Sequence, residues 1–333
     1  MRGEMLRFLI VGFGSIGRRH FDNLKQVGDV KVDVLSRRHL DLPGSRVYSS
    51  PEEALGGQYD AVFIANETAL HIPAAIAFAE RGCHLFIEKP LSDSMKDVHK
   101  LVKLVDRHSL KVMVGCNMRF HPAVRLVERL VRESRIGRII SARIEAGEYL
   151  PNWHPGRDYR NSYSARRESG GGVILDLIHE LDYACWFFGI ASKVFCLSGK
   201  KSDLEIETED TAEILIDFRN GALCEVHLDY LQRPSCRSFK LTGTKGTIWA
   251  DLLTSKVSIY GNNTSGMEGI DLKEGLERNR MYMCEVKHFI DYLGGSSREP
   301  LPSLDNGIKV LQIALAAKES SREGRAINIP QDI

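Results

Sequence analysis

The sequence predicts an α/β protein whose first part is a doubly wound parallel sheet, and two observations support this prediction. Short apolar strands alternate with helices up to about residue 120. A glycine-rich turn joins the first strand directly to the first helix. Beyond residue 138, strands follow one another with hairpin signals such as Asn220-Gly221, which favour a largely antiparallel sheet. We therefore expect a first domain at 1–120 and a second at 121–333.

The individual elements follow from apolar runs, caps and breakers. In the first domain we expect strands at Leu6–Val11, Lys31–Leu35, Val47–Tyr48, Asp60–Ala65, His84–Ile87 and Lys111–Cys116. The helices expected between them are Arg18–Val27, one beginning at Pro51 after the N-cap Ser50, Ile72–Arg81 and Ser92–His108. In the second domain we expect helices at Pro122–Ser134, Leu276–Gly294 and Leu304–Arg322, and strands at Arg138–Tyr149 and near 194–200, 211–218, 222–230, 236–242, 246–251 and 256–260.

Composition limits the class of protein. The 333 residues are 43% hydrophobic and 27% charged, as in ordinary globular proteins. The formal net charge of +1 gives no global field for nucleic acid or an anionic membrane. No apolar run is long enough for a signal peptide or a membrane span. The seven cysteines are scattered without a CxxC pair, which predicts reduced thiols in a cytoplasmic protein and no metal site.

The glycine-rich turn carries the first chemical signal. It lies between a strand and a helix, with a second strand after them, which makes its GxGxxG pattern a specific one for a dinucleotide. The first glycine makes a tight turn, the second admits a pyrophosphate, and the third lets helix and strand pack closely. The residues expected to bind cofactor here are Gly12, Phe13, Gly14, Ser15, Ile16 and Gly17.

The end of the second strand indicates which dinucleotide is bound. An NAD site usually has Asp or Glu here for the ribose 2′-hydroxyl. This chain has Ser36, Arg37 and Arg38, which suit a 2′-phosphate. We therefore predict NADP, with NAD as the second possibility. The alternative is that both arginines are only solvated loop residues.

Three later strand ends should lie at the ligand-binding edge of the same sheet. They contribute the candidate cofactor residues Asn66, His71, Glu88 and Asn117, and the candidate substrate residue Arg119. Lys89 is the strongest candidate for a functional residue at this edge, because it follows a buried strand and precedes Pro90. Partial burial would make its amine a usable proton donor and acceptor, and the Lys89–Pro90 bond is a candidate for cis geometry. The alternative is an ordinary solvated lysine.

Residues 170–182 are the second centre of the prediction. Three glycines precede an apolar run that predicts a buried helix, and Asp176 and His179 would share a face of it, followed by Asp182. Buried charges of this kind are costly unless they are paired or used. The stretch is therefore either a polar core helix whose side chains satisfy one another or part of an active site.

The segment before it, 149–169, is rich in aromatic and arginine side chains. Aromatic faces suit sugar rings, and guanidinium groups suit carboxylates or phosphates. We expect an anionic or nucleotide-linked sugar to be contacted here, the alternative being a purely structural loop. The substrate candidates from this segment are Trp153, Arg157, Tyr159, Arg160 and Tyr163.

Taken together, these motifs resemble those of the glucose-fructose oxidoreductase / inositol dehydrogenase / rhizopine catabolism (Gfo/Idh/MocA) family. The shared features are GxGxxG at 12–17, Glu88-Lys89-Pro90 after a strand, and GGG…D…H…D at 170–182, and the likeness runs over nearly the whole chain. The resemblance implies a Rossmann domain followed by an α/β domain with an open, largely antiparallel sheet. It also implies hydride transfer between a nicotinamide and a carbon of a sugar, inositol or related polyol.

The resemblance further implies that Lys89 and His179 are catalytic, with Asp176 beside them. One feature departs from the family, whose commoner pattern is D-x-x-x-H. Here only two residues separate Asp176 from His179, although His179 still fits H-x-x-D through Asp182. Asp176 would then lie at a different angle on the helix from its counterpart.

These observations predict an NAD(P)-dependent dehydrogenase or reductase. His179 would move the hydroxyl proton and Lys89 would stabilise charge on the same oxygen, while these two residues and Asp176 would also contact substrate. Two alternatives share the resemblance: a glycoside hydrolase that oxidises its substrate transiently, and a non-catalytic NADPH-binding regulator. An open sheet face needs cover, so we also expect a homo-oligomer, a dimer or tetramer.

Overall fold

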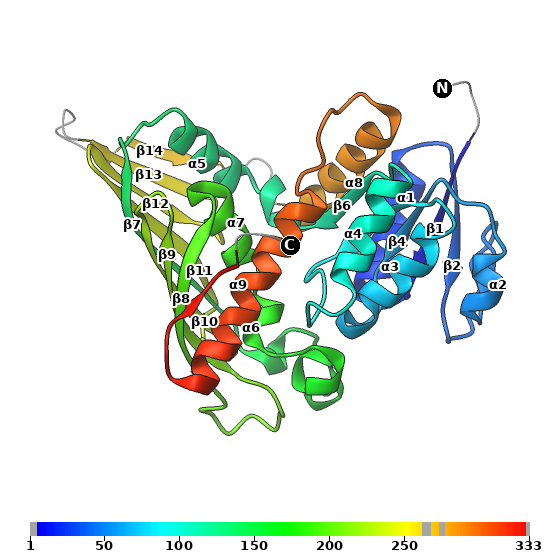
Figure 1. The fold of residues 1–333 in the computed structure, drawn as a ribbon, viewed down its shortest axis with the longest axis horizontal. Helices are drawn as coiled ribbons and strands as arrows, with labels where there is room; N and C mark the ends of the chain where they lie inside the picture. Colours follow the sequence, from blue (N-terminus) through cyan, green and yellow to red (C-terminus); the bar gives the residue numbers. More distant parts are fainter. Residues whose placement is uncertain (1–4, 262–267, 273–276, 331–333) are drawn as a thin grey trace. The chain divides into compact units, whose positions relative to one another are not determined.

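A computed structural model describes residues 5–261, 268–272 and 277–330. The chain forms two compact units, one made of the residues up to Asn117 together with Arg278–Ile308, the other of Met118–Glu277 together with the residues from Lys309 onward. Each unit contains its own sheet (Figure 1). Within the described ranges, no helix is both long enough and apolar enough to cross a membrane.

The first unit is built on a six-stranded parallel sheet with the strand order β3-β2-β1-β4-β5-β6. Its central strands are buried on both faces, as in Phe8, Leu9 and Ile10 of β1, because helices cover both sides of a doubly wound sheet. The strands are β1 (Leu6–Val11), β2 (Val30–Leu35), β3 (Val47–Tyr48), β4 (Ala61–Ile64), β5 (His84–Glu88) and β6 (Val112–Gly115). The α-helices are α1 (Ser15–Val27), α2 (Pro51–Leu55), α3 (His71–Ala79), α4 (Val98–Arg107) and α8 (Arg278–Gly294).

Helix α4 is shorter than its sequence predicts. The expected helix began at Ser92, but residues 92–97 form bends and turns. Asp97, immediately before α4, has φ = +58°, a left-handed conformation that a continuous right-handed helix excludes. The expectation of a helix over Ser92–Asp97 was therefore wrong.

Helix α8 corrects the expected domain division, which placed everything after residue 121 in the second domain. The ring of Phe289 on α8 meets the rings of Phe63 and Phe86 at 5.5 Å between centroids in each case. These aromatic contacts bury α8 in the core of the first unit. Leu276, where we expected this helix to begin, lies outside the described residues.

The second unit contains a nine-stranded sheet with the order β14-β13-β12-β11-β7-β10-β9-β8-β15. β7 and β10 pair in parallel and the other neighbours are antiparallel, so the largely antiparallel sheet is confirmed. The strands are β7 (Ile139–Gly147), β8 (Ala191–Gly199), β9 (Thr211–Phe218), β10 (Leu223–Asp229), β11 (Cys236–Gly243), β12 (Gly246–Asp251), β13 (Lys256–Gly261), β14 (Glu268–Asp271) and β15 (Ile327–Asn328). The helices are α5 (Pro122–Arg132), α6 (Val173–Asp176), α7 (His179–Phe188) and most of α9 (Leu304–Glu323).

The two faces of this sheet differ. In β9, Ala212, Ile214 and Ile216 are buried, while Glu213 and Leu215 between them are exposed. Helices α5, α6 and α7 pack on the buried face. The same two-residue alternation recurs in β7 and β10, which leaves the other face without cover in the described part of the chain.

Candidate active site

The glycine-rich turn of the first unit has the geometry that a phosphate-binding loop needs. Gly12 has φ = +93°, and a Cβ atom on it would lie 2.6 Å from the Asn66 Cα. A Cβ on Gly17 would lie 2.1 Å from the Gly12 carbonyl oxygen, so only glycine fits either position. Around Gly14 the space is open. The first turn of α1 has no side-chain cap and no acidic residue, so its N–H groups fit a dinucleotide pyrophosphate.

The end of β2 presents the predicted arginines to solvent. The Ser36 hydroxyl is buried and accepts a hydrogen bond from the Arg38 N–H at 3.1 Å. Arg37 is 83% exposed and its Nη2 lies 2.8 Å from Glu67 Oε1, after β4. A guanidinium therefore lies at the end of β2, where a ribose is bound in this type of fold.

His71 is buried and holds two loops together; it does not face an open binding site. Its ring is buried, with Nδ1 2.8 Å from the Pro90 carbonyl oxygen and Nε2 3.1 Å from that of Asn66. Burial lowers the pKa of His71, although the two backbone hydrogen bonds oppose that shift. The ring thus links the loops after β4 and β5, and this burial argues against direct contact between His71 and a cofactor.

Lys89 follows β5 as predicted and is half-buried, and its bond to Pro90 is cis. The preceding residue, Glu88, is buried and its Oε1 lies 2.6 Å from His20 Nε2 on α1. The other oxygen of Glu88 accepts a hydrogen bond from the Lys89 N–H at 3.2 Å. Glu88 therefore ties the backbone at Lys89 to the helix of the phosphate-binding loop. The sequence prediction missed His20; its one signal was a histidine three residues after Gly17 on an otherwise polar helix.

The three glycines at 170–172 make room for the chain itself. A Cβ on Gly171 would lie 2.3 Å from the Tyr163 carbonyl oxygen, and one on Gly172 would lie 2.4 Å from Glu209 Oε1. Gly170 and Gly172 also have positive φ angles. The close approach that these glycines permit in this unit is thus with the preceding segment and with Glu209.

The stretch 173–188 forms two helices, so the expected single helix was wrong. α6 ends at Asp176 and α7 begins at His179, because Leu177 has ψ = +35° and leaves the helical conformation. Asp176 and His179 are both buried but do not share a face of one helix. The Tyr230 hydroxyl donates a hydrogen bond to Asp176 Oδ2 at 2.5 Å, a partner that the sequence prediction missed.

Two ion pairs, one buried and one partly exposed, hold α7 in place. Arg119 Nε and Nη2 each lie 2.8 Å from an oxygen of Asp182, and the guanidinium lies 5.1 Å from the centre of the Trp186 ring. Arg237 Nε lies 2.8 Å from Glu180 Oε1. Arg119 is 2% exposed, which argues against its expected role as a substrate contact. These pairs fix the helix whose first residue is His179.

The predicted substrate segment forms a series of short 3-10 turns. Trp153 packs edge-on against Tyr230 at 5.3 Å between ring centroids. Arg160 is paired with Asp158 at 2.8 Å and with Glu205 at 3.2 Å, and the Tyr159 hydroxyl accepts a hydrogen bond from the Glu205 N–H. The turns are Leu150–Asn152, Tyr159–Asn161, Tyr163–Ala165 and Arg167–Ser169. Arg157, Arg160 and Tyr163 are exposed, whereas Trp153 and Tyr159 are partly buried.

The cysteines and acidic residues offer little other chemistry. All seven cysteines are free thiols, and burial raises the pKa of Cys83 to about 11. Among the described residues, no group of three or more His, Cys, Asp or Glu side chains could hold a metal ion. Asn117 is buried at the end of the parallel sheet.

The fold and the glycine-rich loop define a protein with a dinucleotide-binding Rossmann unit. Residues 6–116 match the model of the oxidoreductase family with an NAD-binding Rossmann fold, and residues 124–249 match that of the GFO/IDH/MocA C-terminal domain. Together the two models cover more than two thirds of the sequence. The chain belongs to the Gfo/Idh/MocA family of oxidoreductases.

Similar proteins span the whole chain. Myo-inositol 2-dehydrogenase of Thermotoga maritima is 28% identical over 98% of this chain and 100% of that protein. Levoglucosan dehydrogenase, solved with NADH and levoglucosan, has a TM-score of 0.86 and 20% identity over 98% of this chain and 100% of that one. The WlbA dehydrogenase of Bordetella pertussis, solved with NADH and UDP-GlcNAcA, has a TM-score of 0.84 and 22% identity over 100% of both chains. At these identities the two structures establish the fold.

Proposed function

We propose that this chain interconverts an alcohol and a ketone on a sugar-like substrate, with NADP(H) as its preferred hydride carrier. The observation that carries the proposal is the single sheet edge that bears both the glycine-rich loop after β1 and Lys89 after β5. Ligands of doubly wound sheets bind at this edge. Relatives named for inositol and levoglucosan support a polyol or sugar substrate.

In the proposed reaction, the bound nicotinamide supplies or accepts the hydride. His179 takes the hydroxyl proton in oxidation and returns it in reduction. The Lys89 ammonium donates to the same oxygen and stabilises its developing negative charge. Asp176 orients and tunes these groups, and the N–H groups of the first turn of α1 hold the phosphates. In this proposal Asn66, Glu88 and Asn117 border the cofactor.

We further propose that the substrate is anionic. Arg157 is exposed on the segment leading to α6, and guanidinium groups favour carboxylate and phosphate. Arg160, in contrast, is already engaged by Asp158 and Glu205. One relative's structure contains UDP-GlcNAcA, a nucleotide-linked sugar acid. Trp153, Tyr159 and Tyr163 would supply aromatic surface for a sugar ring.

The activity and the cofactor are tested in one assay. Incubated with NADP+ or NAD+ and a panel of inositols, sugars, sugar acids and glycosides, the protein should reduce NADP+ with the higher kcat/KM. Arg37→Ala should lower kcat/KM with NADP+ by about tenfold and leave that with NAD+ unchanged, because only the 2′-phosphate uses the guanidinium. Arg46→Ala, which removes an arginine stacked on Tyr48 in the same unit, is the control.

Three outcomes of this assay would count against parts of the proposal. Equal or better turnover with NAD+ would contradict the 2′-phosphate interpretation. Cleavage of a glycoside with no net change in nicotinamide absorbance would indicate the hydrolase. Tight NADPH binding without turnover of any substrate in the panel would favour the regulator.

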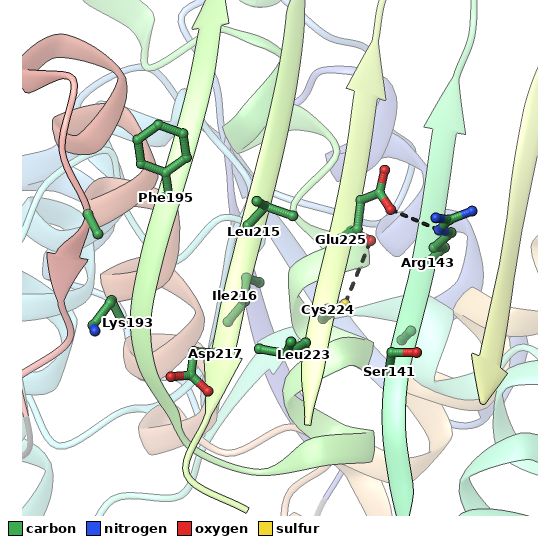
Figure 2. A pocket seen from close by; sticks show the side chains of 12 residues that line it. Ser141, Arg143, Lys193, Phe195, Leu215, Ile216, Asp217, Leu223, Cys224 and Glu225 are labelled. Carbon is green, nitrogen blue, oxygen red and sulfur yellow. Dashed lines mark hydrogen bonds and ion pairs between the residues drawn. The ribbon is translucent and has the colours of Figure 1, made fainter. Parts of the chain in front are cut away.

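We propose that a second copy of the chain covers the open face of the nine-stranded sheet. Figure 2 shows part of this face, a shallow hollow in which Phe195, Leu215 and Leu223 stand beside the ion pair of Arg143 with Glu225. Leu197, Trp249 and Tyr260 are also exposed on it. A patch of exposed apolar side chains that also carries both signs of charge can pair with itself about a twofold axis.

If a second copy covers this face, replacing Leu215 should change the oligomeric state of the protein. The protein should sediment as a dimer or larger species at micromolar concentration, and Leu215→Lys should shift it to the monomer. Leu253→Lys is the matched control, because Leu253 is exposed to a similar extent, 50% against 54%, but lies in a turn outside this face. A wild-type protein that sediments as a monomer throughout would contradict the proposal.

The free thiols support a cytoplasmic location.

A further inference from the structure

Tyr230 is a fully buried tyrosine whose hydroxyl reaches a carboxylate of the proposed site. It follows β10 directly, and its Oη donates to Asp176 Oδ2 at 2.5 Å. Hydrogen bonds to a charged acceptor are shorter and stronger than neutral ones.

The local structure of Asp176 leaves its orientation to distant contacts. α6 is a single turn, preceded by Gly172 with φ = +111° and followed by the break at Leu177. One isolated helical turn has little stability of its own. Because the break at Leu177 separates α6 from α7, the orientation of α7 does not fix that of the Asp176 side chain. A tertiary partner must contribute to its position.

Tyr230, in contrast, is rigidly held. β10 lies inside the sheet, paired with β7 on one side and β9 on the other. The Tyr230 N–H donates to the Asp210 carbonyl oxygen at 2.9 Å, and its own carbonyl oxygen accepts from the Leu150 N–H at 3.0 Å. Trp153 packs against its ring. The hydroxyl is therefore a fixed donor.

The surrounding charges favour this hydrogen bond. Burial raises the pKa of Tyr230 well above its usual value, with Asp176, Tyr163 and Glu209 adding to the shift, so the phenol keeps its proton. Glu209 packs over Gly172. Burial raises the pKa of Glu209 more than the nearby Lys318 lowers it, so this carboxyl group is harder to ionise than usual. A hydrogen-bond donor directed at Asp176 offsets the unfavourable electrostatic interaction between Asp176 and this second carboxyl group.

We propose that Tyr230 is a positioning residue that orients the Asp176 carboxylate during the proposed reaction. This inference rests on the proposed function, in which Asp176 orients the proton-transferring groups. It gives the carboxylate a partner outside the helix that carries His179, because Tyr230 follows β10 and donates to Asp176.

The test compares two fully buried tyrosines whose hydroxyl groups donate to different carboxylates. Tyr183 is also fully buried, and its hydroxyl donates to another carboxylate, Glu180 Oε1, at 3.2 Å. Tyr230→Phe and Tyr183→Phe should therefore lower Tm to a similar extent. Only Tyr230→Phe should lower kcat, by about tenfold to a hundredfold, with the KM for cofactor unchanged.

A spectroscopic readout works without substrate. The carboxylate stretching band of Asp176 can be isolated by isotope-edited infrared difference between ¹³C-aspartate-labelled protein and its Asp176→Asn variant. Tyr230→Phe should shift this band, and Tyr183→Phe should leave it in place. An unshifted band, or equal kcat losses in both variants, overturns the proposal. If the band shifts but the wild-type protein turns over no substrate, the proposed function fails and the placement of Asp176 by Tyr230 stands.

Discussion

Replacement of Lys89 by Met is expected to lower kcat by about a thousandfold or more while NADPH still binds. In the proposed reaction this side chain supplies the positive charge that the substrate oxygen needs as it becomes negative, and one such donor contributes about a hundredfold to a thousandfold. Help with proton transfer adds a similar factor. Met preserves the length and the apolar stem of lysine and removes only the ammonium group.

Cofactor binding should survive because its determinants lie elsewhere. The phosphate-binding loop spans Gly12 to Gly17, and the backbone at Lys89 is held by the side chain of Glu88. Fluorescence titration with NADPH and steady-state kinetics measure the two effects separately. Lys100→Met is the control, since Lys100 is an exposed lysine of α4 paired with Glu80. Near-normal turnover of the Lys89 variant would remove Lys89 from the mechanism.

The first unit was largely predictable because its signals are local. A buried strand, a glycine-rich turn and a helix follow one another within a few residues, and each glycine at 12 and 17 has a steric reason in its immediate surroundings. The start of α4 was not predictable, because residues 92–97 contain no strong helix breaker. The left-handed Asp97 is a property of the folded chain.

The assignment of α8 illustrates what a sequence pattern omits. Its apolar residues predict a helix with one buried face, but they do not indicate which part of the protein covers that face. The contacts of Phe289 with Phe63 and Phe86 join residues about two hundred positions apart, and periodicity carries no information at that separation.

The candidate site shows the same division between local and distant information. The need for partners was predictable, because buried charged groups are costly when unpaired. Which partner each group takes was not: Asp176 meets Tyr230, Glu88 meets His20, and Asp182 meets Arg119. The break at Leu177 also lacked a signal, since the apolar run from Val173 contains neither glycine nor proline.

Arg119→Met is expected to destabilise the protein by about 3–5 kcal/mol, because it leaves the buried Asp182 without its counter-ion. The pair is bidentate and almost fully buried, so water cannot replace the lost guanidinium. Urea unfolding followed by circular dichroism measures the loss. Arg135→Met breaks an exposed pair with Glu268 of similar length, 3.0 Å, and should cost less than about 1 kcal/mol.

The double variant Arg119→Met with Asp182→Leu separates the two roles that Arg119 could have. If the guanidinium serves only to neutralise Asp182, removing both charges should restore most of the lost stability, because two apolar side chains can replace a buried ion pair at little cost. If Arg119 contacts the substrate, as its position after the parallel sheet first suggested, the single variant should keep its stability and raise KM instead. The 2% exposure of Arg119 favours the first result. His179 begins the helix that this pair anchors, so loss of activity in the single variant should follow the loss of folded protein, and activity per folded molecule should change much less than for Lys89→Met.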